Sequence, residues 1–189
     1  MNTNLTPLGV DDLLPSETNK YLTIVEKIET VFKKYNYKKI KTPTIEYLDS
    51  LSPGLGEKLQ SQAIKFFDSE GQVQILRPDN TTPIARLVAQ RKDVLPIPQR
   101  LSYLAPVFRN DTMQKNKQKE IFQAGIEFIG GEGPQSDGEI IEIAIETLKA
   151  LGHTDFIIEI GHTDFTNDLS EIKKEALLNG DYITFGDIP

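Results

Sequence analysis

Three short stretches of the sequence carry side chains that could bind an amino acid. Arg109 ends an apolar run, and a guanidinium held there could make two parallel hydrogen bonds to a carboxylate or a phosphate. Gln123 and Glu127 are four residues apart, so an extended strand places both on one face. Asp79 and Thr81 add an acid and a hydroxyl at a predicted helix start. Together these groups suit the ammonium and carboxylate ends of an amino acid.

Each stretch also has a purely structural explanation. An arginine such as Arg109 is more often part of a surface ion pair. Gln123 and Glu127 suit an ordinary solvated strand face equally well, and Asp79 suits a helix cap. The presence of all three stretches in one chain favours a binding site over these structural explanations. Gly125 is expected to leave space between the side chains of Gln123 and Glu127.

A repeated pentapeptide raises the question of a metal site. Gly-His-Thr-Asp-Phe occurs at 152–156 and again at 161–165, and histidine and aspartate are common metal ligands. The copies flank a predicted strand and are expected to lie roughly 25 to 30 Å apart, at about 3.3 Å per residue. One ion could not bind both, so we predict no metal. Lysines at 115–119 are predicted to be a solvated hairpin tip, with a tRNA or nucleotide contact as the alternative.

Apolar spacing predicts the elements of the first half of the chain. A helix is expected over 17–35, after a cap at Ser16, followed by a short strand at 37–41. Residues 48–61 are rich in Ser, Gly and Pro and are expected to form a loop with at most one helical turn. Strands at 63–68 and 72–76 are predicted to form a hairpin, with a glycine of positive φ in its turn.

The second half is predicted to alternate helices with long strands. A helix over 80–91 precedes strands at 99–108 and 120–129, which form a long hairpin. A helix over 139–151 and a buried strand at 156–160 follow. The buried stripe of that helix is expected to be Ile140, Ile141, Ala144, Ile145 and Leu148. Because neighbouring strands form hairpins, the pattern indicates an α+β fold, with a mainly antiparallel sheet flanked by helices.

Length and composition narrow the classes further. The 189 residues fit a single domain, 1–189, in which 162–189 is a polar tail of the kind that a truncated chain leaves. A net charge of -7 argues against broad nucleic-acid binding. The absence of cysteine excludes disulfides, thiolate zinc sites and cysteine nucleophiles, and favours the cytoplasm. No signal peptide or membrane-spanning segment is predicted.

The same stretches resemble the histidyl-tRNA synthetases, which are class II aminoacyl-tRNA synthetases. Residues 76–81, Leu-Arg-Pro-Asp-Asn-Thr, resemble the Leu-Arg-Pro-Glu-Gly-Thr segment of that family. Residues 122–127 resemble its Phe-His-Gln-x-Gly-x-Glu strand, and Arg109 resembles the motif 2 arginine. Residues 37–46 are similar to motif 1, and 8–15 to the family's Gly-x-x-Asp-x-x-Pro entry. The resemblance implies a class II synthetase-like catalytic-domain fold that is truncated in this chain.

The resemblance also implies roles for the candidate residues. Asp79 and Thr81 would contact the amino group of a substrate, and Gln123 and Glu127 would complete a histidine-like pocket. Arg109 would face the carboxylate or an α-phosphate. No cofactor is expected.

The departures from the synthetase pattern decide the predicted function. Synthetases continue motif 2 as Arg-x-Glu-Arg-Pro-Gln with further arginines, whereas residues 109–119 place an aspartate and lysines there. The histidine-specific segment, motif 3 and the anticodon-binding domain have no counterpart, so adenylation is not expected. Arg-Pro-Asp-x-Thr followed by Ile-Ala-Arg at 84–86 is instead similar to the regulatory subunits of ATP phosphoribosyltransferase, which are synthetase paralogues.

By that resemblance we predict a non-catalytic regulatory subunit in histidine biosynthesis. Its partner would be the short-form catalytic subunit, and its regulation allosteric, with histidine as the ligand. A homodimer through 21–43 is expected within a hetero-oligomer, and neither tRNA nor a membrane is an expected partner. A fragment of an active histidyl-tRNA synthetase and a free-standing amino-acid sensor are the alternatives.

Overall fold

The computed structural model describes residues 6–110, 118–161, 170 and 172–174. The chain divides into two compact units, Met1–His153 and Thr154–Pro189, and each is described by itself. The single-domain interpretation therefore stays a prediction. No helix among these residues is long and apolar enough to cross a membrane.

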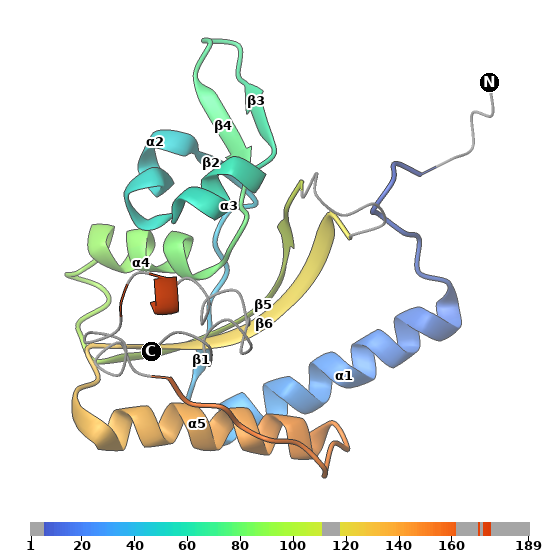
Figure 1. The fold of residues 1–189 in the computed structure, drawn as a ribbon, viewed down its shortest axis with the longest axis vertical. Coiled ribbons are helices and arrows are strands. Elements are labelled where there is room, and N and C mark those ends of the chain that lie inside the picture. Colours follow the sequence, from blue (N-terminus) through green and yellow to red (C-terminus); the bar gives the residue numbers. More distant parts are fainter. Residues whose placement is uncertain (1–5, 111–117, 162–169, 171, 175–189) are drawn as a thin grey trace. The chain divides into compact units, whose positions relative to one another are not determined.

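The first unit has an α+β fold, as predicted (Figure 1). One sheet has the strand order β1-β5-β6, with β1 parallel to β5 and β5 antiparallel to β6. The other has the order β2-β4-β3 and is antiparallel throughout. The elements are, in chain order, α1 (Pro15–Lys34), β1 (Lys38–Lys39), β2 (Ile45–Tyr47), α2 (Leu48–Leu51), η1 (Ser52–Gly54), α3 (Glu57–Gln62), β3 (Lys65–Phe67), β4 (Val73–Leu76), α4 (Thr81–Gln90), β5 (Gln99–Phe108), β6 (Glu120–Ile129) and α5 (Gly133–Ala150).

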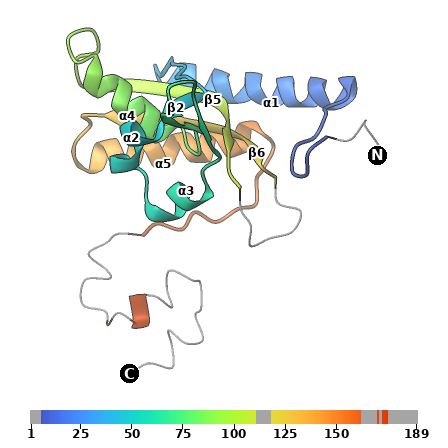
Figure 2. The same cartoon turned by 90° about the horizontal axis from the view of Figure 1, so that it is seen from above.

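The long hairpin of β5 and β6 separates two apolar cores. Helices α1 and α5 lie on one side of these strands and α4 on the other (Figure 1), and α1 and α5 run side by side in both views (Figures 1 and 2). Ile126 and Phe128 of β6 pack against α1 and α5. Tyr103 of β5 packs against Ile84 and Val88 of α4. The predicted alternation of β6 is thus confirmed, and its other face, which carries Gln123 and Glu127, lies on the side of α4.

Helix α1 starts two residues earlier than the apolar pattern suggests. The predicted cap at Ser16 is wrong, because the helix begins at Pro15 with Leu14 as its N-cap. The backbone N–H of Leu14 donates to the Glu17 carboxylate at 2.9 Å. Proline is well tolerated in the first turn, where its missing N–H has no helical partner to lose.

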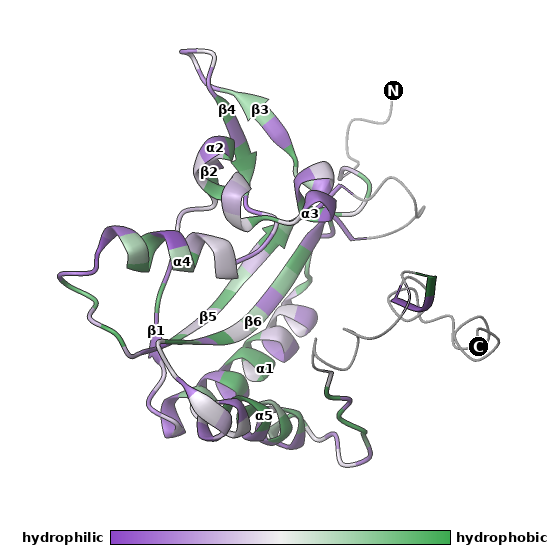
Figure 3. Ribbon diagram, turned by 60° about the vertical axis from the view of Figure 1, so that its left-hand side comes forward, coloured by the Kyte–Doolittle hydropathy of each residue, from purple (hydrophilic) through white to green (hydrophobic). Residues whose placement is uncertain are grey.

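Helix α5 buries a different stripe from the predicted one. It begins at Gly133, and Ile143, which is 1% exposed, is its one buried residue. Ile140 and Leu151 pack beside Ile143, whereas Ala144 is exposed. Isoleucines at 140, 141, 143 and 145 fall on more than one side of the helix, and apolar segments of α5 are green in Figure 3. The sequence alone therefore leaves the orientation open, and packing against α1 decides it.

Residues 48–61 form α2, η1 and α3 rather than the predicted loop. Leu51 and Leu55 are buried with Ile75 of β4, so burial of apolar side chains outweighs the turn-forming composition. The hairpin that follows is confirmed. Asp68 accepts hydrogen bonds from the backbone N–H groups of Glu70 and Gln72, and the turn ends on a glycine with φ 80°.

In the second unit the predicted buried strand at 156–160 is wrong. These residues pair with no strand, and Ile157 and Ile160 are 88% and 68% exposed. A strand needs a neighbour for its N–H and C=O groups, which local apolarity cannot supply. His162 and most of the lysine-rich tip, at 111–117, lie outside the described residues.

Candidate functional site

A buried arginine anchors the loop that leads into α4. Arg77 is 2% exposed, and its Nε donates to the carbonyl of Pro106 on β5 at 2.9 Å. Its Nη1 donates to the carbonyls of Thr42 at 2.9 Å and Pro43 at 3.2 Å. Burial lowers the pKa of this guanidinium, and the nearby Glu46 carboxylate opposes the effect. Arg77 therefore joins three segments beneath the candidate site, a role that the sequence pattern did not single out.

Asp79 accepts hydrogen bonds from the first turn of α4, in line with its structural explanation, although the N-cap residue itself is Asn80. Its Oδ2 accepts hydrogen bonds from the backbone N–H of Thr82 at 3.1 Å and from the Thr82 hydroxyl at 3.2 Å. Both contacts use one carboxylate oxygen, so Oδ1 remains an acceptor. Bonding to the helix and ligand binding are thus compatible at this residue.

Gln123 is tied to the same loop through Asn80. Its Oε1 accepts from the Asn80 backbone N–H at 3.2 Å and from Asn80 Nδ2 at 2.9 Å. Asn80 is buried, and Nδ2 also donates to the carbonyl of Ala105 at 3.4 Å. The side-chain oxygen Oε1 of Gln123 thus positions the loop. The side-chain NH₂ group of Gln123 is the part suited to a ligand. Asn80 replaces the glycine of the synthetase pattern. This replacement is the sequence feature from which the role of Asn80 could have been predicted.

Thr81 and Glu127 form the closest polar contact among the predicted residues. The Thr81 hydroxyl donates to Glu127 Oε1 at 2.7 Å. Burial raises the pKa of the Glu127 carboxyl, the hydrogen bond from Thr81 lowers it, and the charge of Asp79 raises it further. The fold therefore brings Asp79, Thr81 and Glu127 together, although they span 48 positions of the sequence.

The expected space above Gly125 is filled, so that prediction is wrong. Tyr103 is the direct partner of Gly125 in the β5–β6 ladder, and a Cβ on Gly125 would lie 2.3 Å from the Tyr103 hydroxyl oxygen. Burial raises the pKa of the Tyr103 hydroxyl, a hydrogen bond with Thr81 lowers it, and the charges of Glu127 and Asp79 raise it. Tyr103 could have been found from the register of the predicted hairpin, since cross-strand partners share a face.

Arg109 lies at the end of the site nearest Asp79. Its Nε donates to the carbonyl of Pro78 at 2.8 Å, and its backbone forms a bridge with Ala63. The contact ties Arg109 to the residue that precedes Asp79. Arg109, Asp79 and Gln123 thus converge on one loop, while Thr81 and Glu127 form the other end of the site.

An apolar cleft of about 670 Å³ adjoins Thr81 and Glu127. Its other walls come from α4, the connector to β5 and the end of β6: Ala85, Val88, Ala89, Lys92, Leu95, Pro96, Ile97 and Ile129. A small pocket with a few polar groups at one end and apolar walls is typical of a site for a small molecule. The volume is ample for an amino acid.

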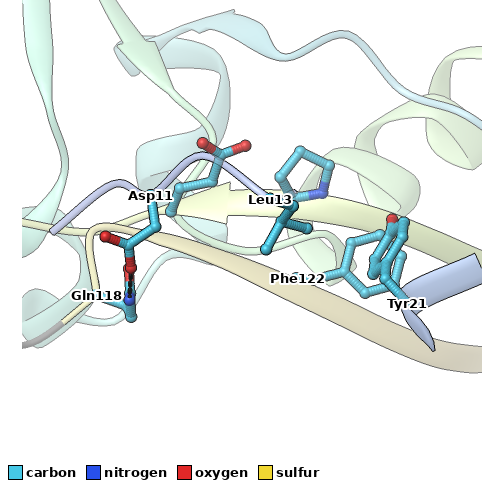
Figure 4. Close-up of a pocket in the computed structure, with 7 residues that line it drawn as sticks. Asp11, Leu13, Tyr21, Gln118 and Phe122 are labelled. Atoms are coloured by element: carbon cyan, nitrogen blue, oxygen red, sulfur yellow. Dashed lines mark hydrogen bonds between the residues drawn. The ribbon is translucent and has the colours of Figure 1, made fainter. Parts of the chain in front are cut away.

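A second cleft of about 420 Å³ lies on the α1 side of the hairpin (Figure 4). Gln118 Nε2 donates to Asp11 there, and the rings of Tyr21 and Phe122 meet edge to face with centroids 4.8 Å apart. None of the predicted site residues lines this cleft. The alternation of β6 explains the separation, because Phe122 and Glu127 point to opposite faces.

The chain is similar to histidyl-tRNA synthetases and to regulatory subunits of ATP phosphoribosyltransferase. A family model described as "Histidyl-tRNA synthetase" matches residues 9–179. A protein of Halothermothrix orenii named "ATP phosphoribosyltransferase regulatory subunit" is 46% identical over 94% of this chain and 42% of its own length. A protein of the same name from Symbiobacterium thermophilum is 37% identical over 95% of this chain and 48% of its own length. The chain thus spans less than half the length of these curated relatives.

Solved structures show the same likeness. A chain described as an ATP phosphoribosyltransferase regulatory subunit/histidyl-tRNA synthetase from Bacillus halodurans matches with a TM-score of 0.87 and 31% identity, over 98% of this chain and 50% of that one. The apo histidyl-tRNA synthetase of S. aureus matches with a TM-score of 0.66 and 27% identity, over 78% of this chain and 35% of that one.

Proposed function

Since this chain belongs to the histidyl-tRNA synthetase family and has the class II synthetase-like fold predicted from its sequence, we propose that it is a regulatory subunit of ATP phosphoribosyltransferase. It acts in histidine biosynthesis with a short-form catalytic subunit, which performs the transfer of phosphoribose to ATP. The observation that carries this proposal is the name shared by its relatives at 37–46% identity. No catalytic residue is assigned to this chain.

The proposed ligand is histidine, bound along the line from Arg109 to Glu127. Asp79 Oδ1, with the neighbouring Thr81, suits the ammonium group. The NH₂ group of Gln123 and the guanidinium of Arg109 suit the carboxylate, and Glu127 accepts from the imidazole N–H. The contact of 2.7 Å between Thr81 and Glu127 supports this orientation, because it holds the carboxylate in the wall of the apolar cleft.

The main alternative is an amino-acid-activating function, as in the synthetases. The motif 2 segment argues against it, because lysines at 115, 117 and 119 replace the expected arginines. An ammonium group lacks the planar fork that grips phosphates in two places and stacks on adenine. A free-standing amino-acid sensor would share the pocket but not the partner.

Reconstitution with the short catalytic subunit tests the proposal. We expect a complex on size-exclusion chromatography, and a change in the phosphoribosyl transfer rate that histidine reverses. Glu127→Gln is expected to weaken the response to histidine by at least about ten-fold while leaving the complex intact. Glu70→Gln, at the exposed turn of the β3–β4 hairpin, is the matched control.

The outcomes separate the candidate functions. Absence of a complex, with no change in transferase activity or histidine inhibition, would overturn the regulatory role. Histidine-dependent exchange of pyrophosphate into ATP would instead support the synthetase alternative. Histidine binding without either activity would indicate a sensor.

The remaining expectations on assembly and location are parts of the same proposal. The expected homodimer through residues 21–43 is supported by Leu22 and Ile24, large apolar side chains of α1 that are exposed. Analytical ultracentrifugation of the chain alone tests it, and a monomer at micromolar concentration would contradict it. Independence from tRNA and a cytoplasmic location stay predictions.

A further inference from the structure

Asn80 is a buried polar side chain that bonds to both long strands of the hairpin. It is 1% exposed and is the N-cap residue of α4. Its Nδ2 donates to the side-chain oxygen Oε1 of Gln123 on β6 at 2.9 Å, and to the carbonyl of Ala105 on β5 at 3.4 Å. Ala105 and Gln123 are direct partners in the β5–β6 ladder. One buried amide group therefore reaches both strands at a single register.

Two backbone groups determine which way the amides of Asn80 and Gln123 face. An amide side chain has an acceptor on one side and a donor on the other, so its partners decide its orientation. A backbone N–H can only donate, and that of Asn80 donates to Gln123 Oε1 at 3.2 Å. A backbone carbonyl can only accept, and that of Ala105 accepts from Asn80 Nδ2. Turning either amide over would place donor against donor or acceptor against acceptor.

The consequence is a fixed donor at one end of the candidate site. Because Gln123 Oε1 accepts from two donors of Asn80, the Nε2 side of Gln123 is turned away from Asn80. Among the residues that the structure describes, Nε2 has no acceptor, so its two N–H groups are left for a ligand. The guanidinium of Arg109 also has donors only. This end of the site therefore offers donors and no acceptor.

We propose that Asn80 determines specificity by locking Gln123 as a donor, so that the site takes a carboxylate and rejects a carboxamide. Only the identity of the ligand is taken from the proposed function. A carboxylate accepts at both of its oxygens, whereas a carboxamide has one oxygen and one NH₂ group. That NH₂ group would face a donor whichever way it turned, either Gln123 or Arg109. If Gln123 were free to turn over, its oxygen could accept from the carboxamide.

Isothermal titration calorimetry with L-histidine and L-histidinamide tests the proposal. The two ligands have nearly the same shape, and we expect the parent to prefer histidine by at least about ten-fold. Asn80→Gly removes the side-chain donor to Gln123 and keeps the backbone N–H. We expect the preference to fall by about three-fold to ten-fold, since one of the two hydrogen bonds that fix the amide is lost.

Asn36→Gly is the matched control. Asn36 is exposed at the end of α1, on the other side of the hairpin from α4, and its φ of 63° suits glycine. This variant makes the same chemical change away from the site and is expected to keep the parent's preference. Thermal melting of both variants checks that they are folded at the temperature of the titration.

The ratio of the two affinities is a readout that a loss of packing would not change. General loosening of the loop before α4 weakens both ligands alike, whereas release of the Gln123 amide weakens histidine more than histidinamide. The expected result is therefore a smaller ratio in Asn80→Gly. An unchanged or larger ratio in a folded Asn80→Gly protein would overturn the proposal.

NMR of the ligand-free parent tests the amide orientation by itself. If the parent binds neither compound, the histidine assignment fails, and this measurement still decides the role of Asn80, as it does if Asn80→Gly fails to fold. The side-chain amide protons of Asn80 are expected to exchange with solvent more slowly than those of Gln123, because Nδ2 is buried and bonded. The reverse order of exchange, or a strong nuclear Overhauser effect between the Asn80 backbone amide proton and the Gln123 NH₂ group, would show that the amide is turned over and would overturn the proposal.

Discussion

Replacing Arg77 by methionine is expected to lower the free energy of unfolding by about 3–5 kcal/mol. The guanidinium donates to the carbonyls of Pro106, Thr42 and Pro43 at 2.9, 2.9 and 3.2 Å, and it is 2% exposed. A buried carbonyl left without a donor costs about 1–3 kcal/mol. The carbonyl of Thr42 is in a buried contact, whereas those of Pro106 and Pro43 are in partly buried contacts and contribute less. Methionine carries no charge, so the substitution also removes the cost of burying the guanidinium charge. That gain offsets a few kcal/mol of the loss.

Urea unfolding of the purified chain measures this change, with Arg91→Met as the matched control. Arg91 is exposed at the end of α4, so its substitution is expected to change stability by less than about 0.5 kcal/mol. Arg77→Lys keeps the charge but lacks the fork, and is expected to recover at most about half of the loss. A loss below about 1 kcal/mol for Arg77→Met would refute the view that the guanidinium holds these three segments together.

Two further substitutions probe the site itself. Burial raises the pKa of Glu127 above its ordinary value of 4.5, so the protonated form is favoured on folding, and stability should fall as the pH rises from 4.5 through the folded-state pKa. The glutamine of Glu127→Gln cannot ionise, so this variant should not lose stability as the pH rises. Urea unfolding between about pH 4 and about pH 8 measures the difference from the parent. If both proteins show the same pH profile, the raised pKa of Glu127 is contradicted. Asn80→Ala removes the side-chain donor to Gln123 and Ala105 and should cost about 1–3 kcal/mol, whereas a neutral result would show that the loop before α4 is held by other contacts.

Alternating polarity made the central hairpin predictable from sequence. Strands β5 and β6 have the predicted bounds, and Gln123 and Glu127 lie on the face opposite to Ile126 and Phe128. A strand repeats every two residues, so local sequence assigns each side chain to a face without reference to distant parts of the chain. The resemblance of residues 76–81 and 122–127 to the synthetase pattern was likewise a property of sequence alone.

Other features depended on contacts between distant residues. The buried side of α5 is centred on Ile143 because α1 packs there, and a helix with apolar residues on several sides does not specify that choice by itself. Residues 48–61 became helical because Leu51 and Leu55 find Ile75 to pack against. The apolar run at 156–160, by contrast, is no strand, since no ladder partner pairs with it.

The candidate site shows the same division between sequence and tertiary structure. Residue types and their resemblance to a family were enough to select Asp79, Thr81, Gln123 and Glu127 from the sequence. Only the folded chain decided that Tyr103 fills the space above Gly125 and that Asp79 also bonds to the first turn of a helix. The physical reason is that periodicity acts over a few neighbouring residues, whereas hydrogen bonds and steric exclusion join atoms from strands and loops that meet only after folding.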